Sequence, residues 1–130
     1  IEGIRRIKAA LPGVFASLGV SNVSFGLRPH ARAVLNSVFL HHCVEAGLDM
    51  AIVNAAHITP YAEIDEEQRA LADDLIFNRR DDALARYIAY FEEHTAEEAE
   101  RVDPTAIMTP EEAIHWMILH RQRKGIEELV

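Results

Sequence analysis

The chain has 130 residues, of which 49% are hydrophobic and 26% are charged, and its formal net charge is −8 at pH 7. This composition is typical of one globular domain and excludes a disordered chain. The negative charge disfavours binding to nucleic acids and to anionic membranes, because both require a basic face.

Other features of the sequence bear on where the protein acts. We recognise no signal peptide and no apolar run near the length of about 20 residues that a membrane-spanning helix needs. The single cysteine, Cys43, has no partner for an internal disulfide. A reducing compartment, the cytoplasm, is therefore expected.

The first half of the chain predicts two helices alternating with two strands. Residues 1–11 have apolar side chains at three- and four-residue spacing, which predicts an amphipathic helix. Residues 14–20 form an apolar run typical of a strand buried on both faces. Residues 29–46 predict a second helix that ends at Gly47, and residues 48–53 a second short strand. A helix between two buried strands predicts parallel pairing.

The second half predicts acidic helices. One is expected over residues 65–78, where negative charges lie at its N-terminus, and another over residues 81–94. Residues 95–108 are expected to be a linker or a weak helix. A last helix begins at Thr109 with Thr at the N-cap and Glu112 three residues later. The apolar stripes expected in the core are Val34, Leu35, Val38, Phe39 and Val44 on one helix, and Leu84, Tyr87, Ile88 and Phe91 on another.

Polar side chains follow both predicted strands. Ser21, Asn22 and Ser24 come after the first strand, and Asn54 ends the second. In α/β folds, ligands bind at the carboxyl ends of the strands. A plain turn role is the alternative for Asn22, because Asn favours turns. The two serines are expected to be hydrogen-bonding loop residues rather than nucleophiles.

A metal site is not expected. His41, His42 and Cys43 are adjacent, and neighbouring side chains on a helix point about 100° apart, so this trio does not converge. Cys43 is expected to be a small buried hydrophobic residue. The acidic stretch 65–82 is expected to be solvated helix surface.

Four segments carry a resemblance to a known family, and they are Val20–Leu27, Leu35–Leu40, Gly47–Asn54 and Asp73–Asp82. In this order they resemble the methyltetrahydrofolate-binding domain of cobalamin-dependent methionine synthases and the helical connection that follows it. Residues 124–129 are similar to the first helix of the cap over the cobalamin domain.

The resemblance implies an α/β fold in a helix-dominated chain. Residues 1–62 would be the C-terminal part of a pterin-binding TIM barrel, with its last two parallel strands and their helices. Residues 63–108 would be a helical linker, and residues 109–130 the first helix of the cap. A complete barrel needs about 250 residues, so we expect a piece of a larger protein. Alone, it is expected to be inactive, and its exposed strands favour a non-native homo-oligomer.

The resemblance also implies a reaction, in which a methyl group passes from 5-methyltetrahydrofolate through cobalamin to homocysteine, giving methionine. Asn22 would be the catalytic residue that contacts N5 of the pterin. Ser24, Arg32 and Asn54 would help to bind the folate, with Arg28 as the competing candidate for the arginine. The expected partners are methyltetrahydrofolate and the cobalamin domain of the same polypeptide.

The cofactors of that family are expected to bind elsewhere in the polypeptide. Zinc would belong to a homocysteine domain, and the Asp-x-His-x-x-Gly motif that supplies a ligand to cobalamin does not occur in this sequence. Two other functions stay open. One is a folate or corrinoid methyltransferase of another pathway, and the other is a non-catalytic helical module whose strands complete a partner's sheet.

Overall fold

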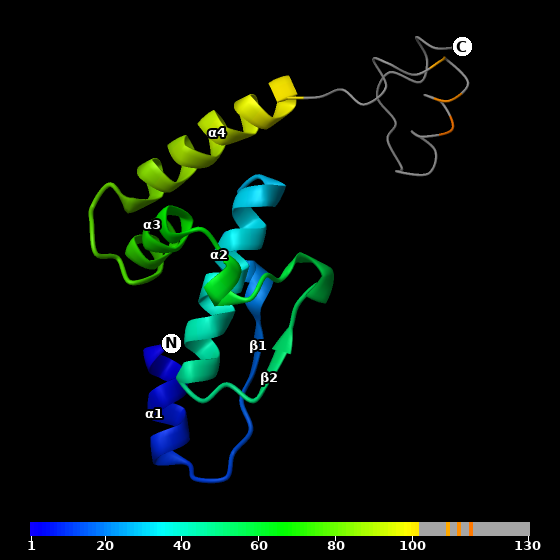
Figure 1. Ribbon diagram of the computed structural model, residues 1–130. Coiled ribbons are helices and arrows are strands. Elements are labelled where there is room, and N and C mark those ends of the chain that lie inside the picture. The colour runs from blue at the N-terminus through cyan, green and yellow to red at the C-terminus, as the bar shows by residue number, and fades with distance from the viewer. Residues whose placement is uncertain (102–108, 110–111, 113–114, 116–130) are drawn as a thin grey trace. The chain divides into compact units, whose positions relative to one another are not determined.

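The computed structural model of the chain (Figure 1) describes residues 1–101, 109, 112 and 115. The chain divides into two compact units, residues 1–92 and 93–130. The helices are α1 (Glu2–Ala10), α2 (Pro29–Glu45), α3 (Glu66–Ile76) and α4 (Ala83–Arg101), and the strands are β1 (Ser17–Gly19) and β2 (Met50–Ile52). Three short 3₁₀ helices are η1 (Val20–Ser24), η2 (Ala55–His57) and η3 (Tyr61–Glu63). None of the helices among these residues is long and apolar enough to cross a membrane.

The two strands pair in parallel, as predicted, with Leu18 opposite Ala51; they lie side by side in Figure 1. Each has only three residues, fewer than the apolar runs suggested. The expectation that both are buried on both faces is wrong. Met50 and Ile52 are 54% and 73% exposed, because within the described residues the sheet consists of this pair alone.

Helix α2 forms the centre of the first unit. Pro29 occupies its first turn, where a missing N–H costs nothing. Gly47 follows its C-terminus with a φ of +98°, the left-handed conformation that glycine adopts without strain. Val34, Leu35 and Val38 are buried as predicted.

Two residues that the sequence placed in the core are exposed instead. Val44 is 57% exposed, because it lies nine residues after Leu35 and therefore points to the opposite side of the helix. Leu84 is 52% exposed, whereas Tyr87 and Phe91 of the same helix are buried. The hydrophobic core consists of Ala31, Val34, Leu35, Val38, Ile64, Leu71, Ala72, Tyr87 and Phe91.

Helices α3 and α4 contribute the other side of this core. Asp65 caps α3 by accepting hydrogen bonds from the backbone N–H groups of Glu67 and Gln68 at 2.9 and 3.4 Å. Tyr87 of α4 donates a hydrogen bond to the Ala31 carbonyl oxygen at 2.7 Å, and burial raises the pKa of this tyrosine. The tie joins α4 to the first turn of α2.

Helix α4 extends to Arg101, beyond the expected end at residue 94, so within residues 95–101 the helix of the two alternatives, linker or weak helix, is the one found. Apart from Thr95, these seven residues are Ala, Glu and Arg, which favour helix. Residues 102–108 lie outside the described part of the chain. The predicted cap at Thr109 is confirmed, because Thr109 and Glu112 exchange hydrogen bonds of 3.0 to 3.4 Å. The rest of that predicted helix, apart from His115, lies outside the described residues.

The N-terminal ends of the strands are tied to α1 by one lysine. Lys8 Nζ donates to both carboxylate oxygens of Asp49, at 2.8 and 3.0 Å, and to the Val14 carbonyl oxygen at 2.9 Å. The Asp49 carboxylate also accepts the Ala16 N–H at 2.8 Å. These hydrogen bonds hold the pKa of Asp49 below its ordinary value. Every member of this group is thus paired.

Candidate functional site

A cavity of about 350 Å³ opens at the C-terminal ends of the two strands. Its lining comes from η1, from the first half of α2 and from the segment after β2. The polar side chains that line it are Ser21, Arg32, Asn36, Asn54 and His57. Two of the predicted folate-binding residues, Arg32 and Asn54, therefore share one cavity. We refer to it as the strand-end cavity.

Ser24 holds Arg32 in place at this cavity. Arg32 Nε donates a hydrogen bond to Ser24 Oγ at 3.2 Å, and Arg32 Nη2 donates to the Ser21 carbonyl oxygen at 3.5 Å. Ser24 Oγ itself donates to the same carbonyl oxygen at 3.2 Å, and Ser24 is fully buried. Ser24 is therefore a positioning residue for the guanidinium group, and its hydroxyl is a hydrogen-bonding group as expected.

Asn22 lies in η1, directly after β1, with its side chain exposed. Its Nδ2 donates a hydrogen bond to the Gly19 carbonyl oxygen at 3.3 Å. A Cβ atom at Gly19 would lie 3.0 Å from Asn22 Nδ2, so a larger residue there would push the Asn22 amide aside by a few tenths of an ångström. Asn22 does not line the strand-end cavity. The turn contact and a ligand contact are compatible, because the amide oxygen is not used in this bond.

Asn54 follows β2 and caps η2. Its Oδ1 accepts the backbone N–H of Ala56 at 3.2 Å, while the side chain lines the strand-end cavity. The amide NH₂ remains the group that a bound molecule would meet, because a carboxamide oxygen accepts and its nitrogen donates.

Asn36 is a cavity residue to which sequence reasoning assigned no role. It is 7% exposed, and its Oδ1 is buried without a hydrogen-bond partner. An unpaired buried amide oxygen typically costs about 1–3 kcal/mol. The available signal was an Asn inside the apolar stripe of a helix, where this residue type is unfavourable and where Leu would serve packing better.

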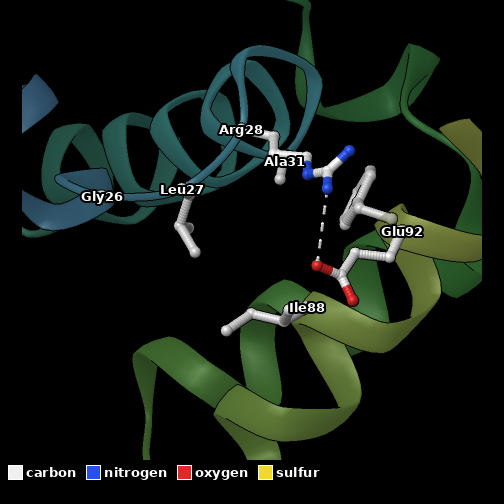
Figure 2. Close-up of a pocket in the computed structure, with 7 residues that line it drawn as sticks. Gly26, Leu27, Arg28, Ala31, Ile88 and Glu92 are labelled. Atoms are coloured by element: carbon white, nitrogen blue, oxygen red, sulfur yellow. Dashed lines mark ion pairs between the residues drawn. The ribbon is translucent and has the colours of Figure 1, made fainter.

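Arg28, the competing arginine, lies elsewhere. It precedes α2 and faces a second cavity of about 280 Å³, which Figure 2 shows between the start of α2 and α4. Arg28 Nη2 lies 3.8 Å from Glu92 Oε1, and Leu27, Ala31 and Ile88 supply apolar lining. The pairing with Glu92 directs Arg28 toward α4, whereas Arg32 is bonded to η1.

The histidine pair on α2 behaves differently from the sequence expectation in one respect. Cys43 is fully buried as expected, and burial raises the pKa of its thiol. His41 and His42 do not converge with Cys43 but with Glu45, which the sequence analysis did not consider.

Comparisons with known proteins match part of this chain. Residues 1–54 match the family described as pterin binding enzymes. The chain is 60% identical over 80 residues to the methionine synthase of Mycobacterium tuberculosis, and 59% identical over 80 residues to that of Mycobacterium leprae. Over these 80 residues the chain is similar to methionine synthases. Each alignment covers 62% of this chain and 7% of the mycobacterial methionine synthase.

Proposed function

We propose that the chain forms the folate-facing end of a methionine synthase that acts in the cytoplasm. In this proposal residues 1–62 complete a pterin-binding TIM barrel, residues 63–108 link it to a cobalamin module, and residues 109–130 begin the cap of that module. The whole polypeptide would transfer a methyl group from 5-methyltetrahydrofolate through cobalamin to homocysteine.

The observation that carries the proposal is the position of the polar residues. Asn22, Arg32 and Asn54 gather at the carboxyl ends of two parallel strands, the part of a barrel where ligands bind. The same residues fall within the stretch, residues 1–54, that matches the pterin-binding family. A barrel would also supply the neighbouring strands that Met50 and Ile52 lack.

The chemistry of Asn22 suits loss of a methyl group from N5 of the folate. A tertiary amine leaves more readily when its nitrogen is protonated, because the leaving group is then neutral. The Asn amide has both donor hydrogens and an acceptor oxygen, so it can face N5 before and after protonation. It would thereby stabilise developing charge without titrating. Rotation of the amide requires only the 3.3 Å bond to Gly19 to be released.

Arg32, Asn36 and Asn54 would bind the rest of the folate. The guanidinium of Arg32 suits an anionic oxygen such as a carboxylate of the glutamate tail. The unpaired Asn36 Oδ1 requires a donor, and pterins present amino and ring N–H groups. The amide NH₂ of Asn54 would complete the polar contacts.

The cobalamin and zinc of the proposed polypeptide do not fit this chain. A zinc site made of thiolates needs several cysteines, and the one cysteine here, Cys43, is fully buried. We therefore assign this chain only the folate side of the reaction, which is to bind, orient and contact N5.

A chimera provides the test. The matching 80-residue stretch of the Mycobacterium tuberculosis methionine synthase is replaced by the corresponding residues of this chain, and methylation of homocysteine is measured. We expect the chimera to be active, and Asn22→Ala to lower kcat by about 10²–10³-fold, the usual effect of removing one group that stabilises developing charge. Val23→Ala is the matched control, because Val23 is the next residue in η1, is exposed and does not line the strand-end cavity. Undiminished turnover in Asn22→Ala would refute the assignment.

The interaction module remains the second candidate, because Phe15, Phe25 and Ile52 are 73% exposed or more. Large exposed apolar side chains mark surfaces that another chain covers. This alternative predicts that the 130-residue chain forms a stable homo-oligomer, and that the chimera is inactive. Turnover of the chimera separates the two functions, because exposed strands favour a homo-oligomer of the isolated chain in both cases.

A further inference from the structure

Four side chains outside the strand-end cavity form a polar cluster at the end of α2. His41, His42 and Glu45 come from its last turns, and Asp73 comes from α3. One potential ligand atom from each of His41, His42 and Glu45 lies within 4.8 Å of the others. Tyr61 of η3 covers the cluster, with its ring stacked on that of His41 at 4.0 Å between centroids.

The spacing of these atoms matches a tetrahedral metal centre. Zinc bonds to nitrogen and oxygen are about 2.0–2.2 Å long, so two ligand atoms in a tetrahedral site lie about 3.4 Å apart. Glu45 Oε2 lies 3.2 Å from His42 Nδ1 and 3.6 Å from His41 Nε2. All three atoms lie within 4.8 Å of one another. Two bonds of about 2.2 Å span at most about 4.4 Å, so binding an ion requires the two imidazole rings to turn slightly toward each other.

The surroundings of His42 call for a cation. Its Nε2 lies 2.7 Å from Asp73 Oδ1, and its Nδ1 lies 3.2 Å from Glu45 Oε2. A neutral imidazole has one N–H and can donate to only one of these carboxylates. The other nitrogen then directs its lone pair at an oxygen, which is unfavourable unless a second proton or a metal ion lies between them.

Asp73 has the position of a supporting residue in metal sites. Histidines that bind metals commonly donate their second ring N–H to a carboxylate, which orients the ring. Asp73 accepts such a bond from His42 and is itself held by Tyr61, whose hydroxyl donates to Asp73 Oδ2 at 3.1 Å. Two neutral imidazoles, two carboxylates and one divalent ion sum to zero charge.

We propose that His41, His42 and Glu45 form a binding site for a divalent transition metal ion of the zinc class. Asp73 orients His42 from outside the coordination shell, and a water molecule takes the fourth position. Two imidazole nitrogens and one carboxylate favour Zn²⁺ or Co²⁺ over Mg²⁺, which prefers oxygen ligands.

This site is independent of the proposed function and of any zinc in a homocysteine domain. It fastens the end of α2 to α3 and η3, because the ion orders His42 against Asp73 and His41 against Tyr61. A bound ion would therefore stabilise the fold, and metal binding itself is the quantity to measure.

Calorimetric titration of ZnCl₂ into the 130-residue chain tests the proposal. We expect one equivalent to bind, Tm to rise by a few degrees, and MgCl₂ to have no effect. Glu45→Gln and His42→Gln should each weaken zinc binding at least about tenfold, a loss typical of disturbed metal sites. His57→Gln removes a histidine outside the cluster and should bind zinc like the unmodified chain.

The spectrum of bound Co²⁺ shows whether Cys43 is among the ligands. The visible bands of tetrahedral Co²⁺ should form without a sulfur-to-metal charge-transfer band, since Cys43 is buried away from the cluster. Circular dichroism confirms folding of each variant. If His42→Gln fails to fold, Glu45→Gln, at an exposed side chain, decides alone. Absence of zinc binding, or equal binding in the Glu45→Gln variant, would overturn the site.

Discussion

The two ends of the parallel strand pair carry polar groups of opposite character. At the N-terminal ends, Lys8 and Asp49 satisfy each other and two backbone groups, Val14 O and Ala16 N. At the C-terminal ends, Asn36 Oδ1 is buried without a partner beside a cavity of about 350 Å³. Completed hydrogen bonds stabilise a fold, whereas an incomplete set lowers stability and leaves valences for a ligand.

This difference indicates where function lies. Polar residues in the first group are explained by the structure that they hold. Those in the second group are only partly explained. Asn54 caps η2 and Ser24 positions Arg32, but Asn36 Oδ1 is buried without a hydrogen-bond partner, and the side chains of Arg32 and Asn54 line an open cavity. A candidate site is therefore recognised by polar groups whose hydrogen bonds the surrounding protein does not complete.

Among the substitutions that compare the two ends, the largest effect is expected from Arg32→Met in the chimera. This change removes the cation from the strand-end cavity, and a hydrogen bond to a charged group is worth about 1.5–3 kcal/mol. The KM for methyltetrahydrofolate should rise by about 10–100-fold. Arg28→Met is the matched control and should change KM by no more than about threefold, because an exposed ion pair such as Arg28–Glu92 contributes little. The reverse ranking would assign the folate to Arg28.

Asn36→Leu should separate stability from binding. Replacing an unsatisfied buried amide with an apolar side chain of similar volume should leave the free energy of unfolding unchanged or raise it by up to about 1 kcal/mol. In the chimera, the KM for methyltetrahydrofolate should rise about tenfold. Urea unfolding of the 130-residue chain and steady-state kinetics provide the two values. A clear loss of stability would mean that the Asn36 oxygen is paired in the folded protein.

Lys8→Met should lower stability without affecting folate binding. It leaves the Val14 carbonyl oxygen and the Asp49 carboxylate without their shared donor. The Tm of the chain should fall by about 5 °C, whereas the KM of the chimera should stay the same. Arg6→Met, two residues earlier on α1 and paired only with Glu2 among the described residues, is the control with little expected effect. A change in KM would contradict the division between the two ends.

The smallest expected effect is a change in the free energy of unfolding at low pH. Hydrogen bonding to Lys8 lowers the pKa of Asp49 from its ordinary value of 3.8. A carboxyl group with a lowered pKa stabilises the folded state above its unfolded pKa, and this contribution is lost as the pH falls through the folded pKa. The stability difference between the unmodified chain and Asp49→Asn should therefore shrink below about pH 3.9. In a Lys8→Met background this pH dependence should become smaller, because only the hydrogen bond from the Ala16 N–H then lowers the pKa of Asp49.

The helical part of the fold was predictable because its signals are local. Proline at the first turn of α2, Gly47 after it and the Thr109–Glu112 cap each act within one turn of helix. The strands were predictable in order and direction but not in burial. An apolar run such as residues 14–20 indicates that a strand can be buried between other elements. Within the described residues no further strand pairs with β1 and β2, so the pair stays partly exposed.

The candidate site was predictable only in part. The strand-end rule and the resemblance pointed to Asn22, Ser24, Arg32 and Asn54. Neither indicated Asn36, because its significance depends on a missing hydrogen-bond partner, which no sequence pattern records. The cluster with Glu45 was missed for a related reason. Spacing along a helix excluded His41 with Cys43, but the convergence of His41 and His42 depends on their rotamers and on Asp73, which is distant in sequence.

The composition of the hydrophobic core has a consequence for the order of assembly. Its nine buried members lie on α2, α3, α4 and at Ile64, and none lies on either strand. The helical layer can therefore collapse on its own, while the strand amides gain protection only after edges from elsewhere dock beside them. Hydrogen exchange should show the amides of β1 and β2 opening without the loss of α2.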